Sequence, residues 1–189
     1  MTYERADHYT RKAKAAGYAA RSVYKLDEIA GRAPLPRSGA AVDLGCFPGS
    51  WSRWLLERRF RVVGVDLQAP DLPGGTWLAR SVYEVEPDEL RAALGGPADL
   101  VVSDMAPNTS GDRFTDHCRQ IALADRALAL ASALLRPGGG FVVKVFDGGD
   151  APPYTQRVRA AFADVKRVKP AATRDRSVEF FLVGTGFRG

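Results

Sequence analysis

The sequence predicts an α/β fold in which a mostly parallel sheet is covered by helices on both faces. Short apolar runs alternate with amphipathic segments along the 189 residues, as in proteins built from βαβ units. Three of these runs end at or next to an aspartate, where open α/β sheets place ligand-binding side chains. Two apolar runs near the C-terminus are joined only by a loop, which indicates one antiparallel strand.

The expected elements follow in chain order. Apolar residues in 18–30 have helical spacing, and Gly31 followed by Pro34 ends that helix. A long Ala/Leu-rich helix extends to about Arg136, where the Pro-Gly-Gly sequence at 137–139 breaks it. The other expected helices are 50–59, 87–94 and about 154–163. The expected strands are 40–45, 61–67, 76–82, 98–104, 140–146, 164–170 and 177–187.

The composition is that of an ordinary soluble globular protein. Hydrophobic residues make up 46% of the chain and charged residues 26%, which excludes a disordered, collagen-like or disulfide-scaffold protein. No apolar run approaches the ~18 residues of a membrane-spanning helix, and the N-terminus lacks the apolar core of a secretory signal. Cys46 and Cys118 are far apart and form no CxxC pair. We therefore expect reduced thiols, a cytoplasmic protein and no metal centre.

Basic residues are concentrated in two segments of a chain whose net charge is +5. The stretch from His8 to Leu26 has no acidic residue and interleaves tyrosines with its basic side chains. Basic groups neutralise phosphates and aromatic rings stack on bases, so this pattern suits RNA; a solvated basic helix explains the charge equally well. The first cluster contains Arg11, Lys12, Lys14, Arg21 and Lys25, and the second contains Lys166, Arg167, Lys169, Arg174 and Arg176.

A glycine-bearing turn follows the first expected strand, in the sequence VDLGCFPGSW at 42–51. Gly45 and Gly49 carry no side chain, which lets a ligand approach the backbone, and the helix starting near Ser50 offers free N–H groups. Asp66 ends the next strand, where a carboxylate binds ribose hydroxyls. The turn lacks GxGxxG, which disfavours a dinucleotide. The acid is compatible with NAD and with S-adenosylmethionine, and a tight turn without any ligand is the remaining alternative.

Four charged residues in separate segments form a second candidate site. Asp104 ends a strand at the ligand-binding edge, and Lys144 lies within the apolar strand 140–146, where an unpaired lysine is costly. If the last strand is antiparallel to that one, Glu179 lies at the same edge and neighbours Lys144. Lys25, on the basic N-terminal helix, completes the group. A buried structural pair of Lys144 with Glu179, and a surface position for Lys25, are the alternatives.

Six segments of the chain resemble the RlmE/FtsJ family, S-adenosylmethionine-dependent methyltransferases that modify ribose 2′-hydroxyls of ribosomal RNA. The similarity runs from about residue 5 to the C-terminus, in order and without a large gap. Together these motifs are highly specific for the family. The segments are YAARSVYKLDEI, VDLGCFPGSW, VVGVDL, DLVVSDMAPNTSG, LLRPGGGFVVKVFDG and KPAATRDRSVEFFLVGTGF.

The resemblance implies a Rossmann-like class I methyltransferase with a mostly parallel seven-stranded sheet and an antiparallel last strand. Residues 1–189 would form one methyltransferase domain with a basic RNA-binding helix at about 8–30. The family's Lys–Asp–Lys–Glu catalytic tetrad corresponds to Lys25, Asp104, Lys144 and Glu179. Its S-adenosylmethionine contacts correspond to Asp43, Gly45, Pro48, Gly49, Trp51, Asp66, Ser81, Val82 and Asp104. RNA contacts are expected at Arg11, Lys12, Lys14, Arg21 and Arg174.

The resemblance also implies a substrate and partners. We expect 2′-O-methylation of a uridine in large-subunit (23S) ribosomal RNA, by a cytoplasmic monomer that binds ribosomal RNA or the large ribosomal subunit and no membrane. A transfer RNA or another RNA as substrate is one alternative, because the same motifs serve it. A noncatalytic RNA-binding relative is another. An NAD oxidoreductase fits least, because GxGxxG is absent and the tetrad would have no role.

Methyl transfer to a hydroxyl gives the tetrad a chemical purpose. A lysine removes the hydroxyl proton only in its neutral form, which burial and a second positive charge favour and neighbouring carboxylates oppose. We expect Lys144 to be the base or to orient the hydroxyl, and Lys25 to position the substrate. Asp104 and Glu179 would hold the lysines in register, while alignment of hydroxyl, methyl and sulfur would supply much of the rate.

Three residues depart from the family pattern. Phe47 adds bulk beside the cofactor, and Ser50 replaces a glycine. Ser81 stands where the family commonly has an aspartate that contacts the adenine amino group. A hydroxyl substitutes only weakly for that carboxylate, although the backbone at Val82 can still contact adenine. We therefore expect these departures to affect cofactor affinity more than the fold.

Overall fold

The computed structural model describes residues 9–13, 15–173 and 177–189, and its centre is a seven-stranded sheet. The strand order is β3-β2-β1-β4-β5-β7-β6, and neighbouring strands are parallel except where β7 pairs with β5 and β6. The predicted fold class, with its antiparallel last strand, is confirmed. The strands are β1 (Gly39–Leu44), β2 (Phe60–Asp66), β3 (Thr76–Ala79), β4 (Ala98–Ser103), β5 (Leu135–Phe146), β6 (Phe162–Val168) and β7 (Glu179–Phe187).

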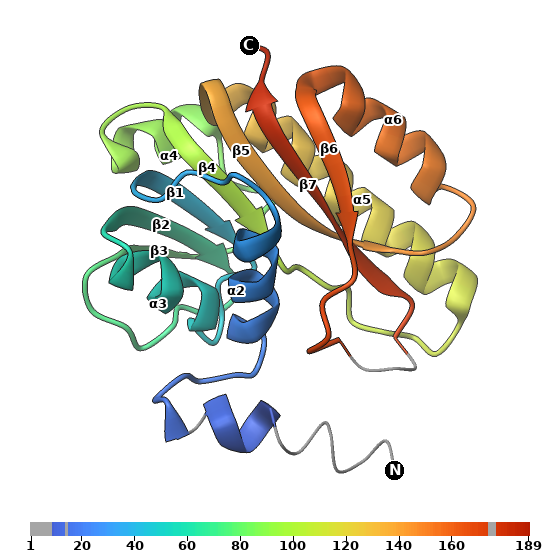
Figure 1. Cartoon of the computed structure of the whole chain (residues 1–189), viewed down its shortest axis with the longest axis horizontal. Helices are drawn as coiled ribbons and strands as arrows, with labels where there is room; N and C mark the ends of the chain where they lie inside the picture. Colours follow the sequence, from blue (N-terminus) through green and yellow to red (C-terminus); the bar gives the residue numbers. More distant parts are fainter. Residues whose placement is uncertain (1–8, 14, 174–176) are drawn as a thin grey trace.

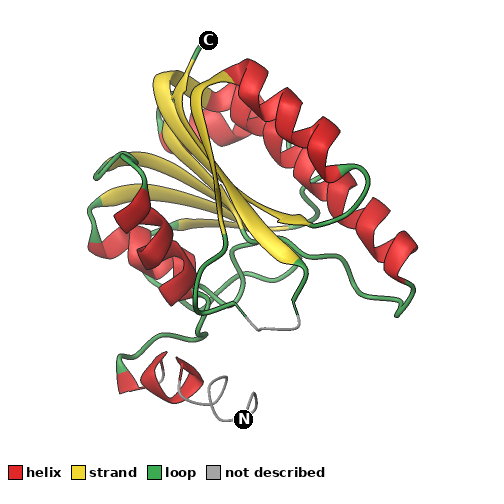
Figure 2. Cartoon of the chain, turned by 45° about the vertical axis from the view of Figure 1, so that its right-hand side comes forward, coloured by secondary structure: helices red, strands yellow, loops and turns green. Residues whose placement is uncertain are grey.

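Helices cover both faces of the sheet (Figure 1, Figure 2). On one face lie α2 (Val23–Arg32) and α3 (Ser50–Glu57); on the other lie α4 (Pro87–Leu94), α5 (Arg113–Leu134) and α6 (Ala151–Ala161). Side chains alternate along β1, so Ala41 joins the core under α2 and α3, while Val42 joins the core under α4, α5 and α6. Among the helices of the described residues, none is both long and apolar enough to cross a membrane.

Local signals in the sequence set the helix ends. Gly49 precedes α3 with φ +101°, a conformation that a side chain would disfavour. The Asp112 carboxylate accepts a hydrogen bond of 2.7 Å from the Thr115 N–H and caps α5. Helix α6 begins at Ala151, earlier than the expected residue 154, because Pro152 is tolerated in the first turn, where its nitrogen needs no partner.

The N-terminal segment is not one helix over 8–30, and this prediction is wrong. Residues 9–13 are helical, but Gly17 has φ +77°, and turns and bends follow it up to the start of α2. A residue in the left-handed region cannot continue a right-handed helix, so the chain changes direction at Gly17.

Two strand boundaries differ from expectation by three residues or more. β3 ends at Ala79 rather than at residue 82, because Ser81 and Glu84 form a tight turn: the Glu84 N–H donates to the Ser81 carbonyl at 3.0 Å. β5 begins at Leu135, so it includes the Pro-Gly-Gly sequence at 137–139 that was expected to separate the helix from this strand, and its pairing with β4 shifts register before the regular part of the strand. Ser81 consequently belongs to a loop at the end of β3.

Candidate active site

The predicted catalytic residues meet at the edge of the sheet where the parallel strands end. Asp104 directly follows β4, and Lys144 lies near the end of β5. β7 runs antiparallel to β5 with Glu179 opposite Phe146, so the first residue of β7 lies at this same edge. Lys25 comes from α2, on one face of the sheet. Segments from the two ends of the chain therefore contribute to one place.

The four side chains form a continuous chain of ion pairs. Lys25 Nζ lies 2.5 Å from Glu179 Oε1 and 4.0 Å from Asp104 Oδ1. Lys144 Nζ lies 3.0 Å from the same Asp104 oxygen and donates a hydrogen bond of 2.5 Å to the Asp104 carbonyl oxygen. The Asp104 carboxylate therefore stands between two ammonium groups. Glu179 pairs with Lys25, whereas the sequence analysis placed it beside Lys144.

This ionic cluster is largely removed from water. Lys144 is 6% exposed and Lys25 is 8% exposed. An ammonium group that leaves water needs a counter-ion, and here two carboxylates balance two ammonium groups. Lys25 Nζ also lies 5.6 Å from the centre of the Phe181 ring, whose face attracts a cation. The cluster is compact, and its formal charges cancel.

A cavity of about 410 Å³ opens beside the ionic cluster, between the loops that follow β1, β2, β3 and β4. Five of the predicted cofactor residues line it, namely Gly45, Asp66, Ser81, Val82 and Asp104. Because Asp104 also pairs with Lys144, the cavity and the ionic cluster share a wall. A ligand in the cavity would lie next to the two lysines.

The local structure explains why the cavity has a glycine at position 45 and an aspartate at position 66. Gly45 has φ +84°, and a Cβ there would lie 2.8 Å from Met105 Cγ, so a side chain would push the loop after β4 away. The Asp66 carboxylate accepts a hydrogen bond of 3.1 Å from the Phe47 N–H, which fixes it at the end of β2. Its further lone pairs suit the hydroxyls of a ribose.

The rim of the cavity is apolar. Phe47, Leu67 and Tyr83 are 47%, 70% and 54% exposed, and all three line the cavity. They are three of the five large hydrophobic side chains that the described residues expose. Apolar surface beside a few fixed polar groups suits an aromatic base attached to a ribose. Sequence reasoning missed Leu67 and Tyr83; the only signal is an apolar residue directly after Asp66 and after Val82.

Asp43 lies beneath the turn rather than on the cavity wall. It is fully buried, and Ser52 Oγ donates a hydrogen bond of 2.6 Å to one carboxylate oxygen, which ties β1 to α3. The other oxygen has no hydrogen-bond partner among the described residues. Burial raises the pKa of Asp43 to about 7, although the hydrogen bond from Ser52 opposes the shift.

The other three predicted cofactor residues also lie outside the cavity lining. Trp51 is buried against Phe181, with ring centres 5.8 Å apart, and its Nε1–H donates to the Ser22 carbonyl oxygen at 2.8 Å. Pro48 is exposed and Gly49 is buried at the start of α3. These residues shape the turn after β1, and their contact with a cofactor stays a prediction.

A buried glutamine behind the ionic cluster was not predicted. Gln120, on α5, donates through Nε2 to the Lys144 carbonyl oxygen at 2.8 Å and to the Met105 carbonyl oxygen at 3.4 Å. It therefore links the ends of β4 and β5, the two segments that carry Asp104 and Lys144. The only signal in the sequence is one amide side chain within an Ala/Leu-rich helix.

The predicted RNA-binding residues lie around the N-terminal segment where the structure describes them. Arg11 and Lys12 are in the helical residues 9–13, and Arg21 is in the turns before α2. Lys14 and Arg174 lie outside the described residues.

Tyrosines of the first basic cluster hold this segment against the helices. Lys12 Nζ lies 4.9 Å from the Tyr24 ring centre, and the Tyr9 ring lies 5.7 Å from the same ring. Tyr18 donates a hydrogen bond of 2.5 Å to Glu57 on α3, and burial together with this carboxylate raises the pKa of Tyr18 to about 12. The aromatic rings therefore make contacts within the protein in addition to any with RNA.

The strand order and the position of the site define the class: this is a Rossmann-like methyltransferase. The model of the FtsJ-like methyltransferase family matches residues 18–187, and the chain belongs to that family.

Individual relatives extend the similarity over nearly the whole chain. The ribosomal RNA large subunit methyltransferase E of Desulfosudis oleivorans is 46% identical over 185 residues, which cover 94% of this chain and 89% of the relative. The protein of the same name from Nitratidesulfovibrio vulgaris is 46% identical over 191 residues, covering 97% and 95%. A crystal structure described as a ribosomal RNA methyltransferase from Plasmodium falciparum has a TM-score of 0.77, with 91% of this chain and 100% of that chain covered. At 23% identity, that likeness supports the fold alone.

Proposed function

We propose that this protein transfers the methyl group of S-adenosylmethionine to a ribose 2′-hydroxyl of ribosomal RNA, at a uridine of the large-subunit RNA. The observation that carries the proposal is the position of Asp104, which lines the cavity and lies 3.0 Å from Lys144 Nζ. This position supports the proposal, because a methyl donor bound in the cavity would lie beside two ammonium groups. The names of the relatives support ribosomal RNA of the large subunit as the substrate.

The cavity fits the methyl donor in its polar groups and in its apolar rim. S-adenosylmethionine supplies a methyl group on a positively charged sulfur, which an oxygen nucleophile can attack. Asp66 would bind the ribose hydroxyls of the cofactor, while Ser81 and the backbone of Val82 would contact its adenine. Phe47 and Tyr83 would pack on the base from the rim. The Asp104 carboxylate would favour the positive charge of the methyl donor.

The ionic cluster would prepare the nucleophile. We assign to Lys144 the role of base, in its neutral form, or of hydroxyl-orienting group, because its Nζ lies closer than that of Lys25 to the carboxylate on the cavity wall. Lys25 would position the ribose, and Glu179 would hold Lys25 at 2.5 Å. Asp104 would fix both lysines, so that the hydroxyl, the methyl group and the sulfur can be aligned.

The basic residues would bind the RNA around this site. Arg11, Lys12, Lys14, Arg21 and Arg174 would neutralise phosphates. We propose that residues 1–189 act as one methyltransferase domain, as a monomer in the cytoplasm, with ribosomal RNA or the large subunit as partner. Transfer RNA and a noncatalytic RNA-binding role are the alternatives that the experiment must separate.

The test is a methyl-transfer assay with radiolabelled S-adenosylmethionine. Naked 23S RNA, isolated unmethylated large subunits and transfer RNA are offered separately, and the labelled ribose is then mapped. Label at a uridine 2′-oxygen of large-subunit RNA supports the proposal, whereas label confined to transfer RNA overturns the assigned substrate. No transfer, together with no heat of S-adenosylmethionine binding in calorimetry, would favour the noncatalytic role.

The Lys144→Ala variant tests the role of the lysine in the same assay. Transfer should fall at least about 100-fold, because a positioned acid–base group typically contributes that much. Cofactor affinity should stay near the wild-type value, because Lys144 is absent from the cavity lining. Near-normal turnover would show that Lys144 is neither the base nor the orienting group.

A further inference from the structure

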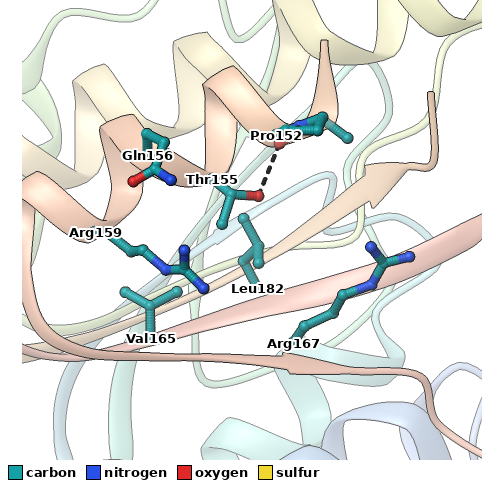
Figure 3. Close-up of a pocket in the computed structure, with 8 residues that line it drawn as sticks. Pro152, Thr155, Gln156, Arg159, Val165, Arg167 and Leu182 are labelled. Carbon is teal, nitrogen blue, oxygen red and sulfur yellow. Dashed lines mark hydrogen bonds between the residues drawn. The ribbon is translucent and has the colours of Figure 1, made fainter. Parts of the chain in front are cut away.

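We propose that a second hollow, between α6 and the outer strand β6, binds a phosphate of the RNA substrate away from the methylated nucleotide. This proposal rests on the proposed function, because it takes RNA as the ligand. The hollow measures about 220 Å³ and is separate from the cofactor cavity, with which it shares no lining residue. Figure 3 shows its side chains coming from α6 on one side and from the sheet on the other.

The lining of the hollow combines arginines with an apolar floor. Arg159 comes from α6 and Arg167 comes from β6, while Val165 and Leu182 lie between them on the sheet (Figure 3). Thr155 adds a hydroxyl, which donates a hydrogen bond of 2.7 Å to the Ala151 carbonyl oxygen and keeps acceptor lone pairs. Guanidinium groups bind phosphate through paired N–H donors, so two of them at one hollow suit a phosphodiester.

The charges of the two arginines are only partly balanced. Among the described residues, no ion-pair or hydrogen-bond partner contacts the Arg159 guanidinium. Arg167 pairs with Asp147 at 2.6 Å, but more than half of each side chain is exposed, and an exposed pair contributes little. The guanidinium of Arg167 lies 3.7 Å from the Phe180 ring centre, so the ring supports it from one side. A phosphate can therefore replace the carboxylate without moving the arginine.

The position of the hollow fits RNA that extends beyond the reacting ribose. Asp147 directly follows β5, so the Arg167 end of the hollow lies toward the edge that carries the ionic cluster. β6 is two strands away from β5, a separation of about 10 Å. Arg167 lies on the α6 face, opposite the face to which Lys144 points, so RNA would reach the hollow by passing the outer strand.

The test measures RNA affinity as a function of salt for the variant carrying Arg159→Ala and Arg167→Ala. Binding of 23S RNA should weaken three- to tenfold at 0.1 M salt. The slope of log K against log salt should become shallower by about 0.7–0.9 for each phosphate that the variant no longer neutralises. Affinity for S-adenosylmethionine should not change. Variants with lysine at both positions should recover most of the salt slope, because lysine keeps the charge.

Arg157→Ala is the control: it removes one positive charge, as each of the two substitutions does, from α6 but outside the hollow, where Arg157 pairs with Asp125 at 2.8 Å. If the double variant binds RNA like this control, the proposal is overturned. If inorganic phosphate binds the wild-type protein but not the double variant, while the two bind RNA equally well, the hollow binds small anions only. That result also overturns the proposal. If the wild-type protein transfers the methyl group, the proposed function stands in both cases. Failure of the phosphate-site proposal can therefore be distinguished from failure of the proposed function.

A second inference rests on a different observation, the anchoring of the loop after β3. We infer that Arg126, on α5, is a positioning residue for the adenine end of the cofactor cavity. Its Nε–H donates to the Val82 carbonyl oxygen at 3.0 Å, and its second guanidinium nitrogen donates to the Val85 carbonyl oxygen at 2.6 Å. Val82 and its neighbours Ser81 and Tyr83 line the cavity, so Arg126 fixes that wall from behind.

The geometry explains why an arginine is needed there. One planar guanidinium spans two carbonyl groups three residues apart, which a single ammonium group cannot do with the same geometry. Without it, the loop would depend on its own turn, in which the Tyr83 N–H donates to Ser81 Oγ at 3.3 Å. The inference also rests on the proposed function, because it takes the cavity as the cofactor site.

The test compares Arg126→Ala and Arg126→Lys with the wild-type protein. The KM for S-adenosylmethionine should rise about tenfold in the alanine variant and less in the lysine variant, while kcat and the KM for RNA stay within twofold. Arg91→Ala is the control, since Arg91 also donates to a backbone carbonyl, that of Ala133, but away from the cavity. An equal rise of KM in both alanine variants, or a fall of kcat alone, would show that Arg126 is merely structural. If the wild-type protein does not bind S-adenosylmethionine in this cavity, that result would instead contradict the proposed function.

Discussion

The ionic cluster and the cavity beside it share Asp104, but they are built in opposite ways. In the cluster, side chains from α2, β5, β7 and the end of β4 hold one another, and both lysines are almost fully buried. In the cavity, loops supply the walls, and large apolar side chains are left exposed at the rim. The side chains of the cluster are thus preorganised by the protein, whereas the cavity has apolar surface still to be covered. A bound ligand would therefore stabilise the loops of the cavity more than the ionic cluster.

The largest expected effect comes from Glu179→Gln, which removes one carboxylate from the cluster. Lys25 would lose its 2.5 Å partner and keep only Asp104 at 4.0 Å. Unfolding free energy should fall by about 3 kcal/mol, because a largely buried ammonium group loses its counter-ion. Methyl transfer should fall about 100-fold, because Lys25 would no longer be held where it positions the ribose. Chemical denaturation and the methyl-transfer assay measure the two effects.

The control for this variant is Asp125→Asn, which breaks the exposed pair of Asp125 with Arg157. Its effect on stability should stay below about 1 kcal/mol. Equal losses in the two variants would mean that burial does not distinguish the cluster from an ordinary surface pair.

Asp43→Asn should remove the pH dependence of stability that titration of the buried Asp43 carboxyl causes. The pKa of Asp43 is raised from 3.8 to about 7 in the folded protein, so the folded state keeps a proton that the unfolded state releases. Stability therefore falls as pH rises from about 4 to about 7, and the full penalty remains above pH 7. Relative to the wild type, the stability of the variant should therefore increase by about 3 kcal/mol from pH 5 to pH 8. Urea unfolding at both pH values measures this; a constant difference would contradict it.

Gly45→Ala tests how closely the loops of the cavity must approach. The new Cβ would lie 2.8 Å from Met105 Cγ, at a φ of +84° that alanine disfavours. The loop after β4 must move, so affinity for S-adenosylmethionine should fall about tenfold, or about 1.4 kcal/mol. Gly74→Ala is the control, because Gly74 also has positive φ but its nearest neighbour would be 3.8 Å away. Calorimetry should find unchanged affinity in the control.

The smallest expected effect is a gain, from Ser81→Asp. This substitution restores the acceptor that the resembled family commonly places beside the adenine amino group. Affinity for S-adenosylmethionine should rise about fivefold, in the range of one net hydrogen bond, about 1 kcal/mol. Ser81→Asn, which has a similar shape without the charge, should gain less. If the aspartate variant binds no better than wild type, the adenine does not depend on position 81.

Sequence reasoning reached the fold and the four clustered residues for physical reasons. Apolar runs that alternate with amphipathic segments indicate βαβ units, and a lysine inside the run 140–146 requires a partner. Helix α4 begins at Pro87 as predicted, because proline is favoured in the first turn, and Gly95 follows its last residue, Leu94. The N-terminal helix was predicted too long, since the periodic pattern does not show that Gly17 adopts a left-handed conformation.

The order of residues along the chain was enough to show which side chains could do chemistry and at which strand ends they would lie. The folded arrangement was needed to establish that Glu179 pairs with Lys25, that Asp43 lies beneath the turn, and that Gln120 and Arg126 support the site from α5. Pattern and propensity act over neighbouring residues, whereas these contacts join residues far apart in the chain. Such partners are chosen by the packing of the sheet and its helices, which no local pattern records.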